Sequence, residues 1–186
     1  MRSSILALLC TSMLTALATV PACADANADM AAMGQAFVGV HSFHADITTS
    51  RTTMSMDMIQ PDKLHMTMNG KMQIIKIGSD VWMNVGGQWQ HMPMAGTMMQ
   101  QPLDMARNAG MEEKGSSNYT VTDDGPAMLD GTLTHKYHMV SKSDGHVVEI
   151  WTVNHLPVQV QVPGNGGVTT IKYSQYNSVP DITPPM

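Results

Sequence analysis

MSMDMIQPDKLHMTMNGKM, residues 54–72, places a methionine at nearly every second position on either side of a Pro-Asp pair. Such alternation of apolar and polar side chains is typical of a β-strand with one buried face. We therefore predict two antiparallel strands joined by a three-residue loop, Pro61-Asp62-Lys63. That loop sets Met58 opposite Met66 and keeps the methionines of both strands on one face of the sheet.

The same period of two recurs along most of the chain. Further strands are predicted near 40–48, 74–77, 81–85, 118–123, 132–141, 145–154, 157–163 and 168–175, separated by turn residues such as GSD and VGGQ. The segment DDGPAMLDG, residues 123–131, is expected to be a loop. Two segments have helical spacing instead, residues 25–39 and residues 97–110.

These elements predict a mainly β fold with short helices. A single antiparallel sheet of about eight or more strands is not expected to stay flat, because large sheets curl and one face must be covered. We therefore expect a strongly curved, unclosed half-barrel with the helices in its concave face. Residues 25–186 are expected to form one such domain.

The N-terminus, MRSSILALLCTSMLTALATVPACADA, predicts a secretory signal peptide over residues 1–24. It has a positive charge at Arg2, an apolar run and then small residues, and the run is shorter than the roughly 20 residues of a membrane-spanning helix. We therefore expect a periplasmic or secreted protein. Acylation of Cys23, the less favoured alternative, would anchor it to a membrane.

The charge balance excludes a nucleic-acid partner. Removal of residues 1–24 takes away Arg2 alone, so 10 basic and 15 acidic residues become 9 and 15, a net charge of −6. An acidic surface does not attract a phosphate backbone. Aromatic residues make up 5% of the chain while methionine occurs 20 times, so methionine supplies an unusual share of the apolar side chains.

The order of motifs carries a family resemblance. The C-terminal half contains LDGTLTHKYHM, HVVEIWTV, NHLPVQVQV, VTTIKYSQYN and VPDITPP, and the N-terminal half has a Pro-Asp hairpin, a GSD turn and an aromatic strand within MIQPDKLHMTMNGKMQIIKIGSDVWMNVGGQWQHMPM. This order resembles the periplasmic outer-membrane lipoprotein carrier (LolA-like) superfamily, which includes mycobacterial lipoproteins and lipoprotein-sorting-like proteins. The resemblance implies an unclosed antiparallel β-barrel with helices at its mouth, which binds acyl chains in its concave face.

The methionine strands are the predicted ligand site. The carrier itself has arginine and aromatic residues in its cavity, whereas the processed chain keeps only Arg51 and Arg107 and places methionine in these strands. We therefore expect a carrier of lipids or other hydrophobic moieties, with a membrane-associated donor or acceptor as a possible partner. The predicted pocket residues are Met54, Met56, Met58, Leu64, Met66 and Met68, and the predicted lid helix carries Met98, Met99, Leu103 and Met105.

Copper binding is an alternative hypothesis. HMTM and HMPM repeat along the chain, which suggests the ligand set His65, Met66, Met68, His91, Met92 and Met94. Thioether and imidazole groups suit Cu(I). Along a regular strand, however, His65 and Met66 point to opposite faces, so one repeat does not gather its own histidine and methionine around one ion.

The sequence predicts a non-enzyme with no cofactor. It contains no G-x-S-x-G, no H-E-x-x-H and no phosphate-binding glycine loop. His135 and His138 are expected to be polar positions on opposite faces of a strand, and His44 has no carboxylate at a spacing that marks a site. A further alternative is a regulatory domain that senses lipoproteins.

Overall fold

The computed structural model describes residues 25–93, 118–164 and 167–186. In this part of the chain one helix precedes eleven strands. Their bounds are α1 Ala26–Val38, β1 Ser42–Thr48, β2 Thr53–Ile59, β3 Lys63–Met68, β4 Met72–Ile77, β5 Asp80–Val85, β6 Gln88–Pro93, β7 Tyr119–Leu129, β8 Thr132–Ser141, β9 Val147–Val153, β10 Leu156–Gly164 and β11 Gly167–Ser174.

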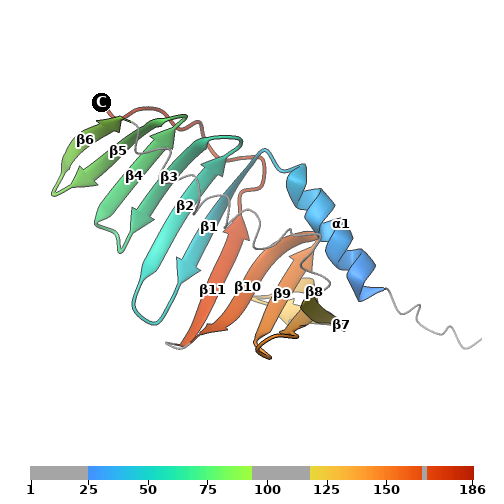
Figure 1. Cartoon of the computed structure of the whole chain (residues 1–186). Coiled ribbons are helices and arrows are strands. Elements are labelled where there is room, and N and C mark those ends of the chain that lie inside the picture. The colour runs from blue at the N-terminus through green and yellow to red at the C-terminus, as the bar shows by residue number, and fades with distance from the viewer. Residues whose placement is uncertain (1–24, 94–117, 165–166) are drawn as a thin grey trace, which may run out of the picture.

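All eleven strands belong to one antiparallel sheet with the order β6-β5-β4-β3-β2-β1-β11-β10-β9-β8-β7. Two runs of consecutive hairpins, β1–β6 and β7–β11, are joined where β1 pairs with β11 (Figure 1). The mainly β class is therefore confirmed. The sheet is unclosed, as expected, but it is not strongly curled, so the strong curvature that we expected is not found.

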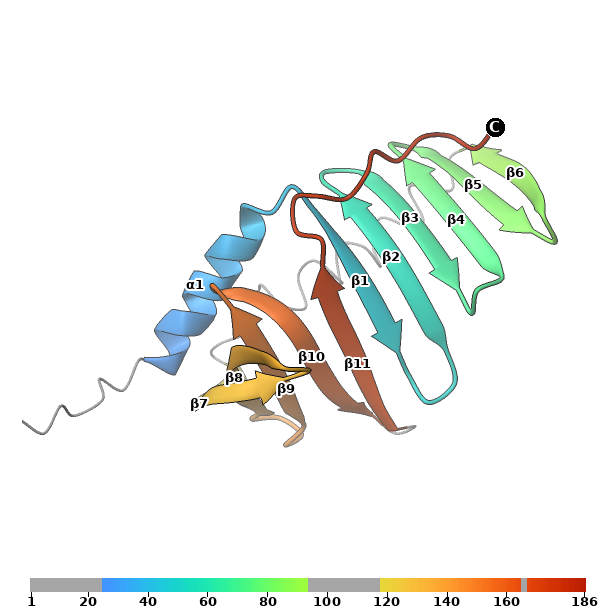
Figure 2. The ribbon, with the colours of Figure 1, turned by 180° about the vertical axis from the view of Figure 1, so that it is seen from behind.

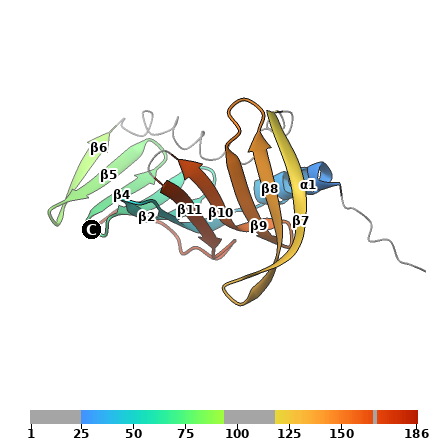
Figure 3. The same ribbon diagram turned by 90° about the horizontal axis from the view of Figure 1, so that it is seen from below.

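The N-terminal helix forms where the sequence predicts it. Asp25 caps α1 by accepting a hydrogen bond from the backbone N–H of Asn27 at 3.0 Å. Near its C-terminal end, Phe37 packs against Phe43 of β1 with the ring centroids 5.2 Å apart. The helix also contacts β7 and β10 (Figure 3). It therefore lies over the β7–β10 side of the sheet, and only its C-terminal end comes close to β1.

The register of the predicted hairpin is wrong by two residues. Ile59 pairs with Lys63, so the loop is residues 60–62, and Met58 lies opposite Leu64 rather than Met66. A shift of two residues keeps every side chain on its face, because side chains alternate with a period of two. The methionines of both strands therefore share one face, as predicted.

The predicted loop at residues 123–131 is also wrong over most of its length. β7 continues to Leu129, and the irregularity is a bulge between Asp123 and Gly125. A β-bulge adds a residue to one strand without ending the pairing. Gly125 has a φ of 83°, which favours glycine at this position. The acidic pair at residues 123–124 therefore lies on a strand, not in a loop.

Cross-strand pairing defines two faces of the sheet. The methionine face carries Met54, Met56, Met58, Leu64, Met66 and Met68, together with Phe43, Ala45 and Ile47 of β1. The histidine face carries the alternate residues, including His44, Asp57, His65, Trp82 and His91. Helix α1 lies on the methionine face, because Phe37 packs against its buried cluster.

The C-terminal segment, residues 175–186, covers part of the histidine face. It runs from the end of β11 across β1–β5 toward β6 (Figure 2). Asn177 fixes its start, since its side-chain oxygen accepts a hydrogen bond from the backbone N–H of His41 at 2.6 Å. Further along, Ile182 is 7% exposed and packs against Ile59 and Ile75. The segment therefore completes a second apolar cluster on this face.

Candidate functional site

The six predicted pocket residues lie side by side on the methionine face. Met54 pairs with Met68, Met56 with Met66, and Met58 with Leu64. Met58 and Leu64 are each 2% exposed, whereas the other four methionines are half-buried. Burial therefore falls along β2 and β3 with distance from the loop at residues 60–62.

The same face continues across β4 and β5. Met68 pairs with Met72, Met66 pairs with Ile74, and Ile74 pairs with Met83. Met72 and Met83 are half-buried like their neighbours. Thioether side chains are flexible and polarizable, which suits a surface that adapts to irregular apolar partners. The methionine face is therefore a partly open apolar surface across several strands.

Lys76 is a member of this face that we did not predict. It pairs with Leu64 on one side and with Val81 on the other, and it is 2% exposed. Its Nζ donates a hydrogen bond to the backbone oxygen of Asp62 at 3.4 Å. The signal for it was present in the sequence, since QIIKI places a lysine at an inward position of an alternating strand.

The predicted copper ligands divide between the two faces. His65 and His91 lie on the histidine face, while Met66, Met68 and Met92 lie on the methionine face, and Met94 lies outside the described residues. Among the described residues, no group of three or more histidine, cysteine, aspartate or glutamate side chains is placed to hold a metal ion. The mixed histidine–methionine set is therefore not assembled.

Other predicted features fall outside the described part of the chain. These are the signal peptide with Cys23 and the lid residues Met98, Met99, Leu103 and Met105. Within residues 25–93, 118–164 and 167–186, no helix has the length and apolar character needed to cross a membrane.

A chain of ion pairs crosses the histidine face. His44 Nδ1 lies 2.6 Å from Asp57 Oδ1, and Asp57 Oδ2 lies 3.7 Å from His65 Nδ1 on the next strand. Burial lowers the pKa of His44, but the hydrogen bond to Asp57 and the charges of Asp46 and Asp57 outweigh it, so that this pKa is raised overall. We did not predict this chain, because its members are brought together by register and not by spacing within one strand.

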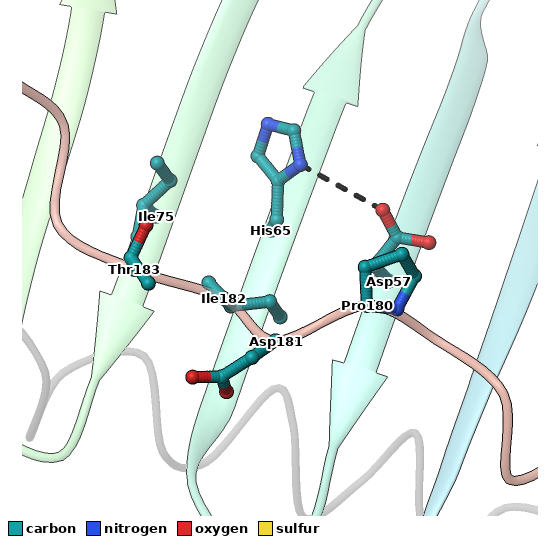
Figure 4. Close-up of a pocket in the computed structure, with 7 residues that line it drawn as sticks. All are labelled: Asp57, His65, Ile75, Pro180, Asp181, Ile182 and Thr183. Atoms are coloured by element: carbon teal, nitrogen blue, oxygen red, sulfur yellow. Dashed lines mark ion pairs between the residues drawn. The ribbon is translucent and has the colours of Figure 1, made fainter.

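A shallow hollow opens beside these pairs. It has a volume of about 200 Å³ and lies between the C-terminal segment and β2–β4 (Figure 4). Its lining residues are Asp57, His65, Ile75, Pro180, Asp181, Ile182 and Thr183. A second hollow, of about 430 Å³, lies at the far ends of β1–β3 and includes Met54 of the predicted pocket. Both hollows have mixed polar and apolar linings.

The β7–β9 end of the sheet is held by polar contacts. Tyr137 donates a hydrogen bond to Asp29 of α1 at 3.1 Å, and burial, together with this aspartate, raises the pKa of Tyr137. His138 Nδ1 lies 2.7 Å from Asp124 Oδ1. The ammonium of Lys136 lies over the ring of Trp151, 4.9 Å from the ring centroid, in a cation–π contact. These contacts fix the helix and the strands, which is a structural role for this region.

Comparison with solved structures identifies the fold. The lipoprotein LppX of Mycobacterium tuberculosis matches with a TM-score of 0.60 at 13% identity, over 84% of this chain and 97% of that chain. LprF of Mycobacterium bovis matches with a TM-score of 0.66 at 15% identity, over 86% of this chain and 96% of that chain. The chain therefore shares the fold of these two mycobacterial proteins, in agreement with the resemblance of its motif order to a superfamily that includes mycobacterial lipoproteins.

Similarity at the level of sequence is much weaker. No protein-family model matches the chain, and no curated protein matches it either. At 13–15% identity the two mycobacterial structures establish the fold alone. The function must therefore be argued from the residues of this chain.

Proposed function

We propose that the protein is a periplasmic or secreted, non-enzymatic carrier that binds an acyl chain or a similar hydrophobic moiety on its methionine face. The observation that carries this proposal is the row of half-buried methionines on adjacent strands, Met54, Met56, Met66, Met68 and Met72. A face used only for packing would be sealed, whereas these side chains retain exposure beside a buried aromatic cluster. Apolar surface of this kind gains free energy when a chain covers it.

The fold supports the same function. The match to LppX spans 84% of this chain and 97% of LppX, and that protein is a lipoprotein. The motif order in this sequence resembles a superfamily that binds acyl chains in the face covered by its helices. In this chain the corresponding face carries α1 and the methionines. We propose a membrane-associated protein as the donor or acceptor of the ligand.

A pair of neighbouring substitutions tests this proposal. Met66 and Thr67 follow one another on β3, so their side chains lie on opposite faces. Displacement of the fluorescent fatty acid cis-parinaric acid by palmitate measures chain binding. Met66→Glu should weaken palmitate binding by about tenfold or more, because the carboxylate would be buried against the chain. Thr67→Glu should leave it unchanged, and equal effects of the two variants would place the site elsewhere.

Cu(I) binding is a second candidate with one observation in its favour. Met54, Met68 and Met72 occupy directly paired positions on β2, β3 and β4, so that three thioethers are neighbours on one face. Thioethers are ligands for Cu(I). This set needs no histidine, and it differs from the predicted set in that respect. A Cu(I) chelator competition with wild type and with Met68→Leu would support the candidate only if the variant lost tight binding.

A further inference from the structure

Lys76 is the buried cation of the methionine face. Its neighbours across the strands are Leu64 and Val81, which are 2% and 0% exposed. Removing an ammonium group from water costs several kcal/mol unless a partner neutralises it. A lysine at this position is therefore costly for packing alone, and a partner for its charge must be found.

The described part of the chain offers few polar partners to the ammonium group of Lys76. Among the described residues, Lys76 Nζ makes one hydrogen bond, to the backbone oxygen of Asp62 at 3.4 Å, although an ammonium carries three donors. Other lysines reach carboxylates: Lys63 pairs with Asp181, and Lys172 pairs with Asp130. Lys76 therefore differs from them in its burial and in its lack of an acidic partner among the described residues.

We propose that Lys76 binds the anionic group of the ligand, so that the protein selects acidic amphiphiles over neutral chains. This inference rests on the proposed function and adds the chemistry of the head group. A carboxylate or a phosphate would accept the two remaining hydrogen bonds of the ammonium and neutralise its charge. Neutral lipids offer only weaker, uncharged acceptors and leave the charge uncompensated.

The geometry also gives the direction of the ligand. Lys76 reaches the loop at residues 60–62, which joins one end of β2 to β3. The half-buried methionines lie progressively farther from that loop, first Met66 and then Met68. From Leu64 to Met68 the strand rises about 13 Å, at about 3.3 Å per residue. The head group lies at the loop end, and the chain extends over the methionines toward the opposite strand ends.

Three competitors that share one chain length test the selection. Palmitate, hexadecyl phosphate and hexadecanol are each used to displace cis-parinaric acid from the wild-type protein, from Lys76→Met and from Lys71→Met. Methionine keeps the length and apolar character of the lysine stem while removing its charge. Lys71→Met is the matched control, because Lys71 is exposed and directly precedes β4, the strand that contains Lys76. Circular dichroism verifies that each variant is folded.

The wild type and Lys71→Met should bind at least one of the two acids about 10- to 100-fold more tightly than hexadecanol, as expected for a charge-assisted hydrogen bond. Lys76→Met should lose this preference and keep its affinity for hexadecanol. Whichever of palmitate and hexadecyl phosphate binds more tightly identifies the preferred head group as carboxylate or phosphate.

Two binding results would overturn the inference and leave the proposed carrier function standing. In the first, the wild type binds the acids and hexadecanol with equal affinity. In the second, Lys76→Met keeps the preference for the acid. A Lys76→Met variant that fails to fold would also overturn it, because the lysine would then have a structural partner. Failure of all three competitors to bind the wild type would instead contradict the proposed function.

Discussion

The two faces of the sheet use the same strands for different purposes. On the methionine face, thioethers stay half-buried and Lys76 stays without an acidic partner among the described residues. On the histidine face, His44 and Asp57 form an ion pair, and the C-terminal segment is fastened by hydrogen bonds. Among the described residues the unmet interactions therefore lie on the face that we propose binds the ligand, while the histidine face is held by contacts within the chain.

The largest effect should come from the aromatic cluster beneath α1. Phe43 is 5% exposed and contacts the rings of Phe37 and Tyr173. Phe43→Ala should lower the free energy of unfolding by about 3–5 kcal/mol, because it leaves a cavity and removes the aromatic contacts. Chemical denaturation measures the change. Val85→Ala, at a residue 56% exposed, should cost less than about 0.5 kcal/mol.

A smaller loss is expected on the histidine face. Ile182→Ala should lower the free energy of unfolding by about 2 kcal/mol, because Ile182 packs against Ile59 and Ile75. Met186, which is fully exposed, is the matched control in the same segment. If Ile182→Ala and Met186→Ala had the same small effect in denaturation, the C-terminal segment would not stabilise this face.

Removal of the buried lysine charge should act in the opposite direction. Lys76→Met is expected to raise the free energy of unfolding of the ligand-free protein by about 1–2 kcal/mol, since a buried ammonium is replaced by an apolar side chain of similar length. Lys71→Met at an exposed position should change it by less than about 0.5 kcal/mol. Thermal and chemical denaturation of delipidated protein measure both, and a clear destabilisation by Lys76→Met would show that the charge is already neutralised.

The smallest effect concerns pH. Because the folded-state pKa of His44 is raised, its pairing with Asp57 and Asp46 stabilises the fold fully below the unfolded-state pKa of about 6.5 and less as pH rises through the folded value. His44→Asn should therefore be more destabilising at about pH 5.5 than at about pH 8.5, by less than about 1 kcal/mol after solvent screening. His155→Asn, at an exposed turn, should show no such difference. If His44→Asn lowered the free energy of unfolding by the same amount at both pH values, His44 would stabilise the fold by packing and not by its charge.

Local patterns were sufficient for much of the fold. The alternation in residues 54–72 predicted which side chains share a face, and the helical spacing within residues 25–39 predicted α1. These features depend on neighbours within one element. The predicted hairpin register was wrong by two residues. Alternation determines only which side chains share a face, and registers that differ by two residues place the same side chains on that face.

Long-range pairing was beyond the sequence. His44 and Asp57 meet because β1 and β2 are in register. Asp46, two residues along β1, also lies 3.3 Å from His44 Nε2, and this partner, which is closer in sequence, was not predicted either. The docking of Ile182 depends on where the chain turns after β11. The position of Lys76 could have been predicted, since it lies two residues from Ile74 and so shares its face of the strand. We did not expect it to be buried, because lysine usually remains exposed to water.

The most direct test of the account asks whether the methionine face acts through its apolar area. Replacing Met54, Met56, Met58, Met66 and Met68 together by leucine keeps volume and apolar character but removes every sulfur atom. Displacement of cis-parinaric acid by palmitate should give an affinity for this variant within about tenfold of the wild type, a difference of about 1.4 kcal/mol. Absence of palmitate binding to the wild type, or a much larger loss in a folded leucine variant, would contradict the account.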